Sequence, residues 1–210
     1  MFEDVRQDFA RCGTTTRQRL EEVAFNPGMW AVLGYRFRRW VQFSNAPWPI
    51  RKFLNFTARF VDLFIRLTTT ITLPASARIG PGLTIPHLGC IVVNSSAVIG
   101  SNCTLTQGVT IGHGGGGRSG KAGCPVLGNR VYVGPGAAIV GPIEVGHDAL
   151  IGIGAVVTRS VSERAVMAGN PARLLSKYGS FDLISYPGME EDSERLESLA
   201  RRAEEERRSG

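Results

Sequence analysis

The segment LGNRVYVGPGAAIVGPIEVGHDALIGIGAVVTRSV, residues 127–161, decides the fold of this 210-residue chain. Apolar residues recur in it at intervals of six: Leu127, Val133, Ile139, Val145, Ile151 and Val157. Glycine follows four of these six residues, and a small or branched apolar residue stands four places after every one. A period of six fits neither an α-helix nor a simple hairpin, but it fits short strands joined by tight turns around a shared interior. Hexapeptide periodicity of this kind predicts a parallel β-helix.

The same period extends upstream of this segment. It runs through Leu73, Ile79, Ile85 and Ile91 and resumes, after a slip of two residues, at Ile99, Leu105 and Ile111. The loop HGGGGRSGKAG, residues 113–123, then interrupts it before Leu127. We therefore expect a mainly β chain with three regions: a helical region over residues 1–70, a β-helix over 71–177, and a charged, mobile extension over 178–210.

The first region reads as helical and aromatic. Pro47 and Pro49 divide it into a helix near residues 28–44 and another near 50–67. Four phenylalanines of the second helix recur at the spacing of one helix face: Phe53, Phe56, Phe60 and Phe64.

Two interpretations of these phenylalanines remain open. The favoured one buries them against the rest of the protein or a second subunit. The other is a weak peripheral membrane contact with four flanking residues at the interface: Trp40, Trp48, Arg51 and Lys52.

Composition excludes several classes of function. Lys and Arg number 24 and Asp and Glu 18, a formal charge of +6 whose one cluster is Arg36, Arg38 and Arg39. Nucleic-acid binding needs a clustered basic face, so no nucleic-acid partner is expected. No apolar run reaches the roughly 18 residues of a membrane-spanning helix, and the start of the chain lacks the apolar core of a secretory signal. Four cysteines without a C-x-x-C pair indicate neither a zinc site nor a disulfide framework. This favours the cytoplasm, with the inner face of the membrane as the alternative location.

Several segments resemble the hexapeptide-repeat acyltransferases, and among them the serine acetyltransferases. They are IGPGLTIPHLGCIVVNSSAVIG (79–100), VTIG (109–112), VGPGAAIVGPIEVG (133–146) and AGNPAR (168–173). The opening MFEDVR and the run CPVLGNRV (124–131) are closer still to acetyltransferases of colanic-acid and other exopolysaccharide pathways. The resemblance implies a left-handed parallel β-helix, a homotrimer or a dimer of trimers, and acetyl-CoA as co-substrate. It implies no metal.

His87, in TIPHLG, matches the catalytic histidine of the family. The resemblance implies that it takes the proton of the acceptor hydroxyl while the oxygen attacks the thioester of acetyl-CoA. Histidine suits this role because its ordinary pKa, about 6.5, lies close to the working pH. Without the resemblance, a structural turn histidine is the more ordinary interpretation. His147, on a regular turn, is expected to face solvent.

Further site residues are expected in two places. His113 and Gly114 open the glycine-rich loop and, with Cys124, form a candidate region beside the acceptor. Arg118 and Lys121 of the loop are candidates for CoA phosphates, and an ordinary surface excursion is the alternative. The resemblance also implies that CoA binds in a groove between adjacent β-helices, contacted by five residues: Ala137, Gly154, Ala155, Arg159 and Arg173.

Three positions depart from the serine acetyltransferase pattern. Pro86, Ile71 and Cys124 stand where those enzymes carry two aspartates and a second histidine. Groups that match an amino-acid acceptor are therefore missing. We expect an acetyl-CoA-dependent O-acetyltransferase that modifies a sugar hydroxyl, on a small or lipid-linked molecule, in exopolysaccharide or capsule assembly. The alternatives are a serine O-acetyltransferase of cysteine biosynthesis and a non-catalytic β-helix scaffold.

Overall fold

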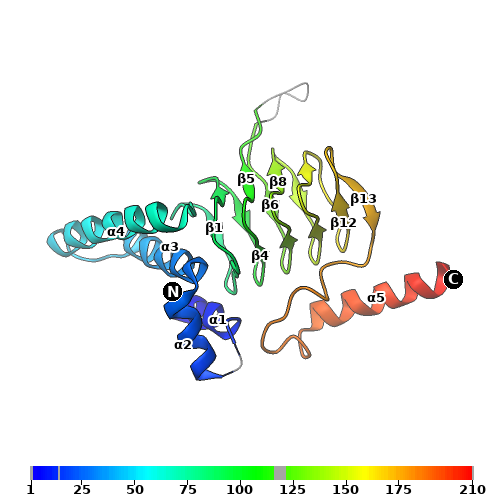
Figure 1. Cartoon of the computed structure of the whole chain (residues 1–210), viewed down its shortest axis with the longest axis horizontal. Coiled ribbons are helices and arrows are strands. Elements are labelled where there is room, and N and C mark those ends of the chain that lie inside the picture. Colours follow the sequence, from blue (N-terminus) through cyan, green and yellow to red (C-terminus); the bar gives the residue numbers. More distant parts are fainter. Residues whose placement is uncertain (1, 14, 116–121, 210) are drawn as a thin grey trace.

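The computed structural model describes residues 2–13, 15–115 and 122–209 (Figure 1). Within them, four helices come first: α1 (Phe2–Ala10), α2 (Thr16–Phe25), α3 (Pro27–Phe43) and α4 (Trp48–Thr69). Thirteen short strands follow: β1 (Arg78–Ile79), β2 (Val92–Val93), β3 (Val98–Ile99), β4 (Thr104–Leu105), β5 (Thr110–Gly112), β6 (Val126–Leu127), β7 (Tyr132–Val133), β8 (Ala138–Val140), β9 (Glu144–Val145), β10 (Leu150–Ile151), β11 (Val156–Val157), β12 (Val166–Ala168) and β13 (Arg173–Ser176). The chain ends in α5 (Ser193–Ser209).

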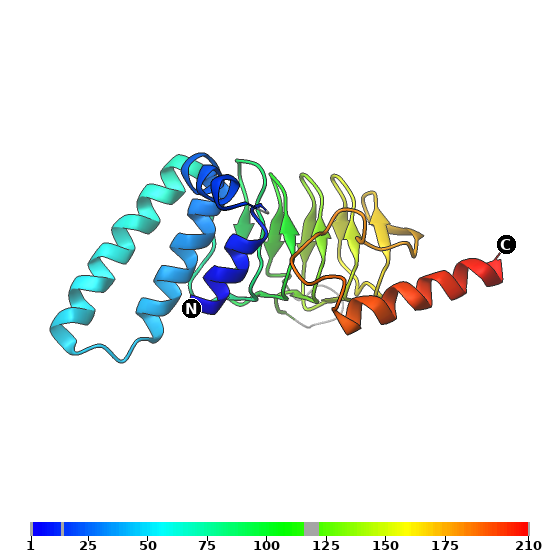
Figure 2. The same cartoon turned by 90° about the horizontal axis from the view of Figure 1, so that it is seen from below.

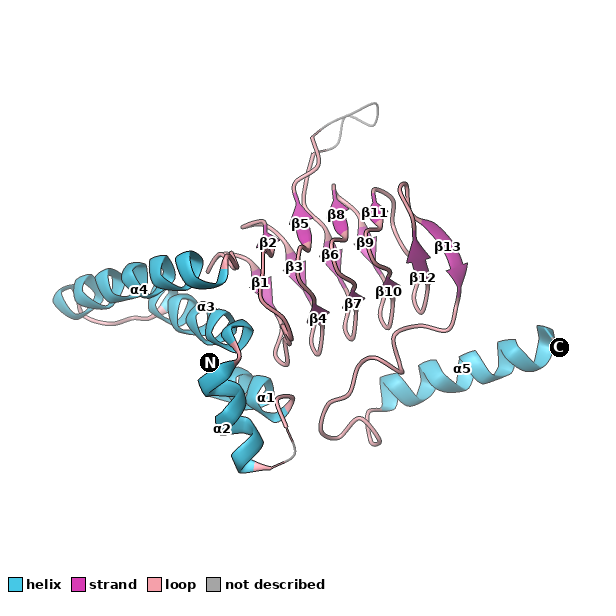
Figure 3. Ribbon diagram, viewed as in Figure 1, coloured by secondary structure: helices cyan, strands magenta, loops and turns pink. Residues whose placement is uncertain are grey.

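The strands form three sheets that are the three faces of one left-handed parallel β-helix (Figure 3). Face 1 holds β1, β3, β6 and β9; face 2 holds β4, β7, β10, β12 and β13; face 3 holds β2, β5, β8 and β11. All strand pairs are parallel except β12 with β13, which closes the last coil. The predicted fold, a β-helix preceded by helices, is confirmed.

The six-residue period marks the interior. Its residues from Leu127 to Val157 are all at most 2% exposed. Each strand has only two to four residues and turns one large apolar side chain inward, so no single strand could be stable alone. The stack of coils supplies the core, at about 1.5–3 kcal/mol for each buried Val, Leu or Ile side chain.

The slip in the period lies in one particular turn. Paired residues of regular coils are 18 apart, as Tyr132 and Leu150 are, whereas those of the first coil are 20 apart, as Arg78 and Val98 are. Val93 pairs with Ile111, so the two extra residues fall between Ile85 and Val93. The turn that contains His87 is therefore longer than the regular turns below it.

Two corners of the β-helix have the same left-handed backbone with different residues. Between faces 1 and 2 the residues with positive φ are Gly82, Asn102, Arg130, Asp148 and Arg164, which we call the side-chain corner. Between faces 2 and 3 each of four coils has a glycine with positive φ, Gly89, Gly108, Gly136 and Gly154, joined in the long first turn by Cys90; we call this the glycine corner. In both, the backbone N–H of one coil donates to a carbonyl of the previous coil, as from Arg130 to Ser101 and from Gly136 to Gln107.

Helix α3 covers the open end of the first coil (Figures 1 and 2). The Tyr35 hydroxyl donates to the Ala77 carbonyl at 2.8 Å and accepts from the Ile79 N–H at 3.1 Å. The Arg36 guanidinium donates to the Ile79 and Gly80 carbonyls, at 2.7 and 2.6 Å, and forms a buried ion pair with Asp8. These contacts satisfy backbone groups that an uncovered coil would leave unpaired.

The predicted helices near 28–44 and 50–67 are confirmed as α3 and α4. The expected burial of the phenylalanines against the rest of this chain is wrong, because all four are more than half exposed. Helix α4 packs on α3 through its other side, where Ala58 and Ile65 are buried. Among the described residues, no helix is long and apolar enough to cross a membrane.

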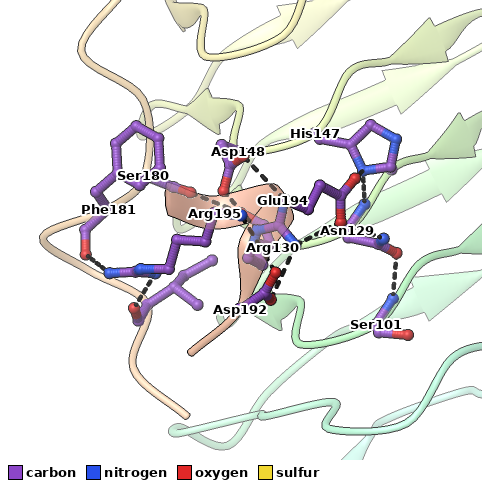
Figure 4. Close-up of polar contacts among 12 residues, drawn as sticks. Ser101, Asn129, Arg130, His147, Asp148, Ser180, Phe181, Asp192, Glu194 and Arg195 are labelled. Carbon is purple, nitrogen blue, oxygen red and sulfur yellow. Dashed lines mark hydrogen bonds and ion pairs between the residues drawn. The ribbon is translucent and has the colours of Figure 1, made fainter. Parts of the chain in front are cut away.

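The C-terminal extension contacts the side-chain corner through polar groups (Figure 4). The guanidinium of Arg130 donates to both carboxylate oxygens of Asp148, at 2.7 and 3.1 Å, and to Glu194 at 2.8 Å. The Ser180 hydroxyl donates to the Arg130 carbonyl at 2.6 Å, and Arg195 is only 7% exposed. The sequence predicted little packing here because it offers few apolar residues, but in the structure charged side chains make the contact together with the buried Phe181 and Ile184.

Candidate active site

His87 lies in the long turn between faces 2 and 3, at the start of the glycine corner. Its side chain is exposed, and in the described part of the chain it has no hydrogen-bond or ion-pair partner. Next to it, the Cys90 N–H donates to the Thr70 hydroxyl at 2.8 Å, which ties the turn to the end of α4. The imidazole is thus on a fixed turn with both ring nitrogens available.

A cavity of 730 Å³ opens beside His87. It lies between the His87 turn and the helical region, and its lining residues are Cys12, Gly13, Gln18, Glu21, Glu22, Phe25, Asn26, Pro27, Pro86, His87 and Leu88. A second cavity of 140 Å³ shares Cys12, Glu22, Asn26 and Pro86 with it. The helical region therefore supplies one wall of the candidate site, and the first coil supplies the other.

Local capping interactions place α2 on this wall. The Thr15 hydroxyl accepts from the Gln18 N–H, and the Gln18 side chain accepts from the Thr15 N–H, a reciprocal capping box. At the other end, the Asn26 side chain accepts from the Gly28 N–H at 2.8 Å and donates to the Glu22 carboxylate at 2.7 Å. Glu22 is thereby held at the cavity, and Glu21 lines it one residue earlier.

The buried Asp8 and the half-buried Arg11 attach the helical region to the coil that carries His87. The Asp8 carboxylate accepts from the N–H groups of Gly82 and Leu83, at 2.8 and 3.1 Å. Burial raises the pKa of Asp8, and its hydrogen bond from Arg36 opposes that shift. Arg11 donates to the Cys103 carbonyl at 2.9 Å, and burial lowers its pKa to about 10. The wall and the turn are therefore held together by polar contacts of low exposure.

Cys12 is the cysteine of this cavity. Its thiol donates to the Asp8 carbonyl at 3.4 Å. Burial, with a smaller effect of the Glu22 carboxylate, raises the pKa of Cys12 to about 11. A thiol that stays protonated near neutral pH is a poor nucleophile, so the chemistry of the cavity rests on His87.

The loop candidates lie at the third corner, between faces 3 and 1, apart from His87 in this chain. Gly114 and Gly123 form an antiparallel bridge at the base of the loop, next to the exposed His113. The Cys124 thiol donates to the Asn94 side chain at 3.1 Å. Arg118 and Lys121 lie outside the described residues.

The candidates for CoA lie on and beside the glycine corner. The Cβ atoms of Ala137 and Ala155 point into the core, and their N–H groups donate to the Gly134 and Gly152 carbonyls, both at 3.2 Å. At Gly136 and Gly154 a Cβ would meet no atom within 4 Å. Arg173, on β13 at the far end of the β-helix, is exposed. Arg159 is also exposed, but it lies in the turn between β11 of face 3 and Val161, which pairs with face 1, and therefore at the corner of the loop.

The sequence interpretation missed two features. Glu21 and Glu22 line the His87 cavity, with Glu21 also paired to the exposed Arg17, and the pattern Thr15-x-x-Gln18 was a capping-box signal for the helix that carries them. His147 is not a plain solvent-facing residue, because the Asn129 N–H donates to its Nδ1 at 3.1 Å beside Glu194. It belongs to the attachment of α5 (Figure 4).

Comparison with known proteins identifies the family. The serine acetyltransferase of Synechococcus elongatus is 32% identical over 182 residues, which cover 85% of this chain and 70% of that protein. The enzyme of the same name from Helicobacter pylori strain 26695 is 35% identical over 161 residues, 77% of this chain and 88% of its own length. The chain belongs to the serine acetyltransferase family. No family model matches it. It spans about half, 51%, of the Escherichia coli relative, which is 35% identical over 150 residues.

Solved structures agree with this assignment. The serine acetyltransferase of Neisseria gonorrhoeae, in complex with serine, superimposes with a TM-score of 0.69 and 25% identity over 83% of this chain and 69% of its own. The soybean enzyme complexed with serine gives a TM-score of 0.67 and 28% identity over 82% of this chain and 68% of its own. As a member of this family, the chain is an acyltransferase, which the sequence predicted.

The preference for a sugar hydroxyl in exopolysaccharide assembly was wrong. The relatives carry the name serine acetyltransferase across many species, which supports the stated alternative. The prediction of a sugar acceptor rested on three departures from the family pattern, at Pro86, Ile71 and Cys124, and on the resemblance of short segments to exopolysaccharide enzymes. All three positions lie outside the N-terminal helices, whereas Glu21 and Glu22 of α2 also line the cavity beside His87.

Proposed function

We propose that this protein is a serine O-acetyltransferase that uses acetyl-CoA, with His87 as the general base. The observation that carries the proposal is the position of His87: exposed, without a protein partner in the described chain, and facing a cavity that two carboxylates share. The names of the relatives supply the acceptor, and the geometry supplies a base at the place where that acceptor would bind.

The chain's own groups support each step of acetyl transfer. The free imidazole nitrogen of His87 takes the proton of the serine hydroxyl as its oxygen attacks the thioester carbonyl. A C–O bond forms, the C–S bond breaks, and the imidazolium returns the proton to the departing CoA thiolate. General-base catalysis of this kind contributes about 10²–10⁴-fold in rate.

The cavity also suits the ammonium group of a small amino-acid acceptor. Free serine carries an ammonium group, and a carboxylate is its natural partner. Glu22 is half-buried and fixed by Asn26, so its charge is oriented before the acceptor arrives. In this proposal Glu22 replaces the aspartate that Pro86 displaces from the family pattern.

The glycine corner fits the extended arm of acetyl-CoA. It begins at Gly89, two residues after His87, and continues through the glycines of the following coils to Gly154. Arg159 and Arg173 match the phosphates, because guanidinium groups recognise them well. Ile153, 78% exposed, adds apolar surface at this corner.

We include the homotrimer in the proposal, with a dimer of trimers as its larger form. A neighbouring β-helix would cover Ile153 and complete the groove, and it would bring its own loop residues His113, Gly114 and Cys124 toward a neighbouring site. The cytoplasm remains the proposed compartment, since all four cysteines are free thiols, which fits a reducing environment.

The experiment follows thiol release from acetyl-CoA with serine as acceptor, for the wild type, His87→Ala and His147→Ala. We expect turnover on serine that falls at least about a hundredfold in His87→Ala. His147→Ala is the matched control, because this histidine lies in the α5 attachment, and its activity should stay close to that of the wild type. Retained turnover in His87→Ala, or turnover on sugar hydroxyls without turnover on serine, contradicts the proposal.

A further inference from the structure

The exposed side of α4 forms a continuous apolar surface, which we call the aromatic face. Its residues are more than half exposed: Phe53, Phe56, Phe60, Leu63, Phe64 and Leu67. They stand opposite the buried side of the helix, and at 1.5 Å per residue they extend over about 20 Å. Six large apolar side chains in one row exceed the scattered exposure that is ordinary on a protein surface.

A row of positive charge borders the aromatic face. Helix α4 carries four basic residues and one acidic residue. That acid, Asp62, is engaged by both Arg38 and Arg66, and its side chain is only 9% exposed. Lys52 and Arg59 follow the same edge as Arg66, seven residues apart, and neither has a carboxylate partner among the described residues.

The tip of the α3–α4 hairpin continues this arrangement. Trp48 is 76% exposed, and the Lys52 ammonium lies 5.7 Å from its ring centroid. On α3, Phe43 is exposed, and the Arg39 guanidinium lies 5.0 Å from its ring. A groove of 470 Å³ combines aromatic and basic side chains, and its lining residues are Trp48, Arg51, Lys52, Asn55, Phe56 and Arg59. Tryptophan beside basic residues is typical of a membrane–water interface.

We propose that the aromatic face of α4 binds the surface of a membrane that contains anionic lipids. The helix would lie in the plane of the interface with its phenylalanines among the acyl chains and with Lys52 and Arg59 at the phosphate level. Charge favours lipid over the same helix of a second copy of this chain. A second α4 offers the same unpaired positive row and no free carboxylate, whereas anionic headgroups neutralise it.

The position of the hairpin is compatible with this contact. It extends beyond the first coil, at the opposite end of the molecule from α5 (Figures 1 and 2). None of the residues of the aromatic face lines the cavity beside His87. Membrane binding and acetyl transfer are therefore separable properties, and the proposal does not depend on the identity of the acceptor.

The test is sedimentation of the full-length chain with vesicles of phosphatidylcholine alone or of equal parts phosphatidylcholine and phosphatidylglycerol. We expect binding to the anionic vesicles that is at least about tenfold stronger than to the neutral ones and that weakens as salt rises. Phe56→Ser with Phe60→Ser lowers binding to the anionic vesicles at least about tenfold. Lys52→Glu with Arg59→Glu does the same and removes the preference for anionic lipid.

Phe2→Ser with Arg6→Glu is the matched control, since it removes one exposed aromatic and one exposed basic residue from α1. It should bind vesicles as the wild type does. Circular dichroism, sedimentation velocity and thiol release are measured for every variant to check its folding, its assembly and its activity. All the substituted positions are exposed, so the variants should fold. The proposal is overturned if the wild type does not bind anionic vesicles. It is also overturned if the phenylalanine substitutions reduce the size of the assembly and leave vesicle binding unchanged, because the face would then join copies of this chain.

Discussion

The side-chain corner and the glycine corner have the same backbone and opposite uses. Both have a residue with positive φ in successive coils, and both repeat the same hydrogen bond to the previous coil. For a residue with a Cβ, this conformation costs about 1–2 kcal/mol. The side-chain corner accepts this cost at Asn102, Arg130 and Asp148, whereas the glycine corner has a glycine in each of these coils and accepts the cost only at Cys90, in the long first turn. A β-helix needs the turn but not the side chain, so each corner is free to specialise.

The specialisation follows from what each corner faces. The side-chain corner receives both terminal segments: Asp8 and Arg11 contact it from the N-terminal helices, and Ser180 and Glu194 contact it from the C-terminal extension. Its side chains are thus structural. The glycine corner begins at His87 and remains uncovered in this chain, which leaves its backbone accessible to a ligand.

The largest effect is expected at the side-chain corner, from Asp148→Ala. Asp148 is 1% exposed, and its carboxylate is the partner of the equally buried Arg130. Burial by itself lowers the pKa of Arg130, but its hydrogen bonds to Asp148 and Glu194 raise it above the ordinary value. Asp148→Ala leaves the buried guanidinium of Arg130 with only the more exposed carboxylates of Glu194 and Asp192, so we expect a cost at the lower end of the about 3–5 kcal/mol of a broken buried pair. Urea denaturation at fixed protein concentration measures this change.

The exposed Asp182 is the control for this substitution, and Asp182→Ala should leave the free energy of unfolding unchanged. If Asp148→Ala lowers the free energy of unfolding by less than about 1 kcal/mol, which is what an exposed ion pair contributes, the side chains of this corner do not stabilise the fold as we propose.

At the glycine corner, Gly136→Ala should have a smaller effect. Its φ is +68° and nothing crowds the site, so the only cost is the left-handed conformation, about 1–2 kcal/mol. Gly115→Ala is the matched control, because it also has open space and has no positive φ. Urea denaturation should separate the two variants.

The same Gly136→Ala variant sharpens the functional side of the comparison. A methyl group on the glycine corner should raise KM for acetyl-CoA severalfold and leave KM for serine unchanged, in steady-state assays of thiol release. An equal rise in both KM values would mean that the corner does not select the co-substrate.

The smallest effect is the pH dependence that Glu194 contributes at the side-chain corner. Its hydrogen bond from Arg130 holds the pKa of Glu194 below the usual value. A carboxyl group whose pKa is lower in the folded chain stabilises the fold when the pH is above its pKa in the unfolded chain, about 4.3. This contribution is lost as the pH falls through the pKa of the folded chain. Glu194 is 45% exposed, so after screening by solvent the contribution is less than about 1 kcal/mol.

Glu194→Gln should therefore reduce the loss of stability between about pH 6 and about pH 3, measured by urea denaturation at both values. An unchanged pH dependence would show that the α5 attachment is not sensitive to this charge.

The sequence predicted structure best where the spacing of apolar residues fits a single type of fold. The apolar residues spaced six apart from Leu127 to Val157 predicted the β-helix, because that spacing places one side chain in the interior on each face of each coil. Phe53 to Phe64 predicted a helix with an apolar side, but periodicity does not say what covers that side. The α2 wall and the attachment by Arg130 were not predicted, since they join residues far apart in the chain through polar contacts. His87 was proposed from its motif, and the slip of two residues around it was an independent signal of an unusual turn.

The bridge between Gly114 and Gly123 has a consequence for how this protein can vary. Residues paired across the loop, such as Val98 and Val126, are 28 apart, ten more than in a regular coil, and yet strand register continues undisturbed on all three faces. The chain leaves the coil and re-enters it at one corner, so we expect a change in the length of the loop to leave the coils and the turn with His87 in place.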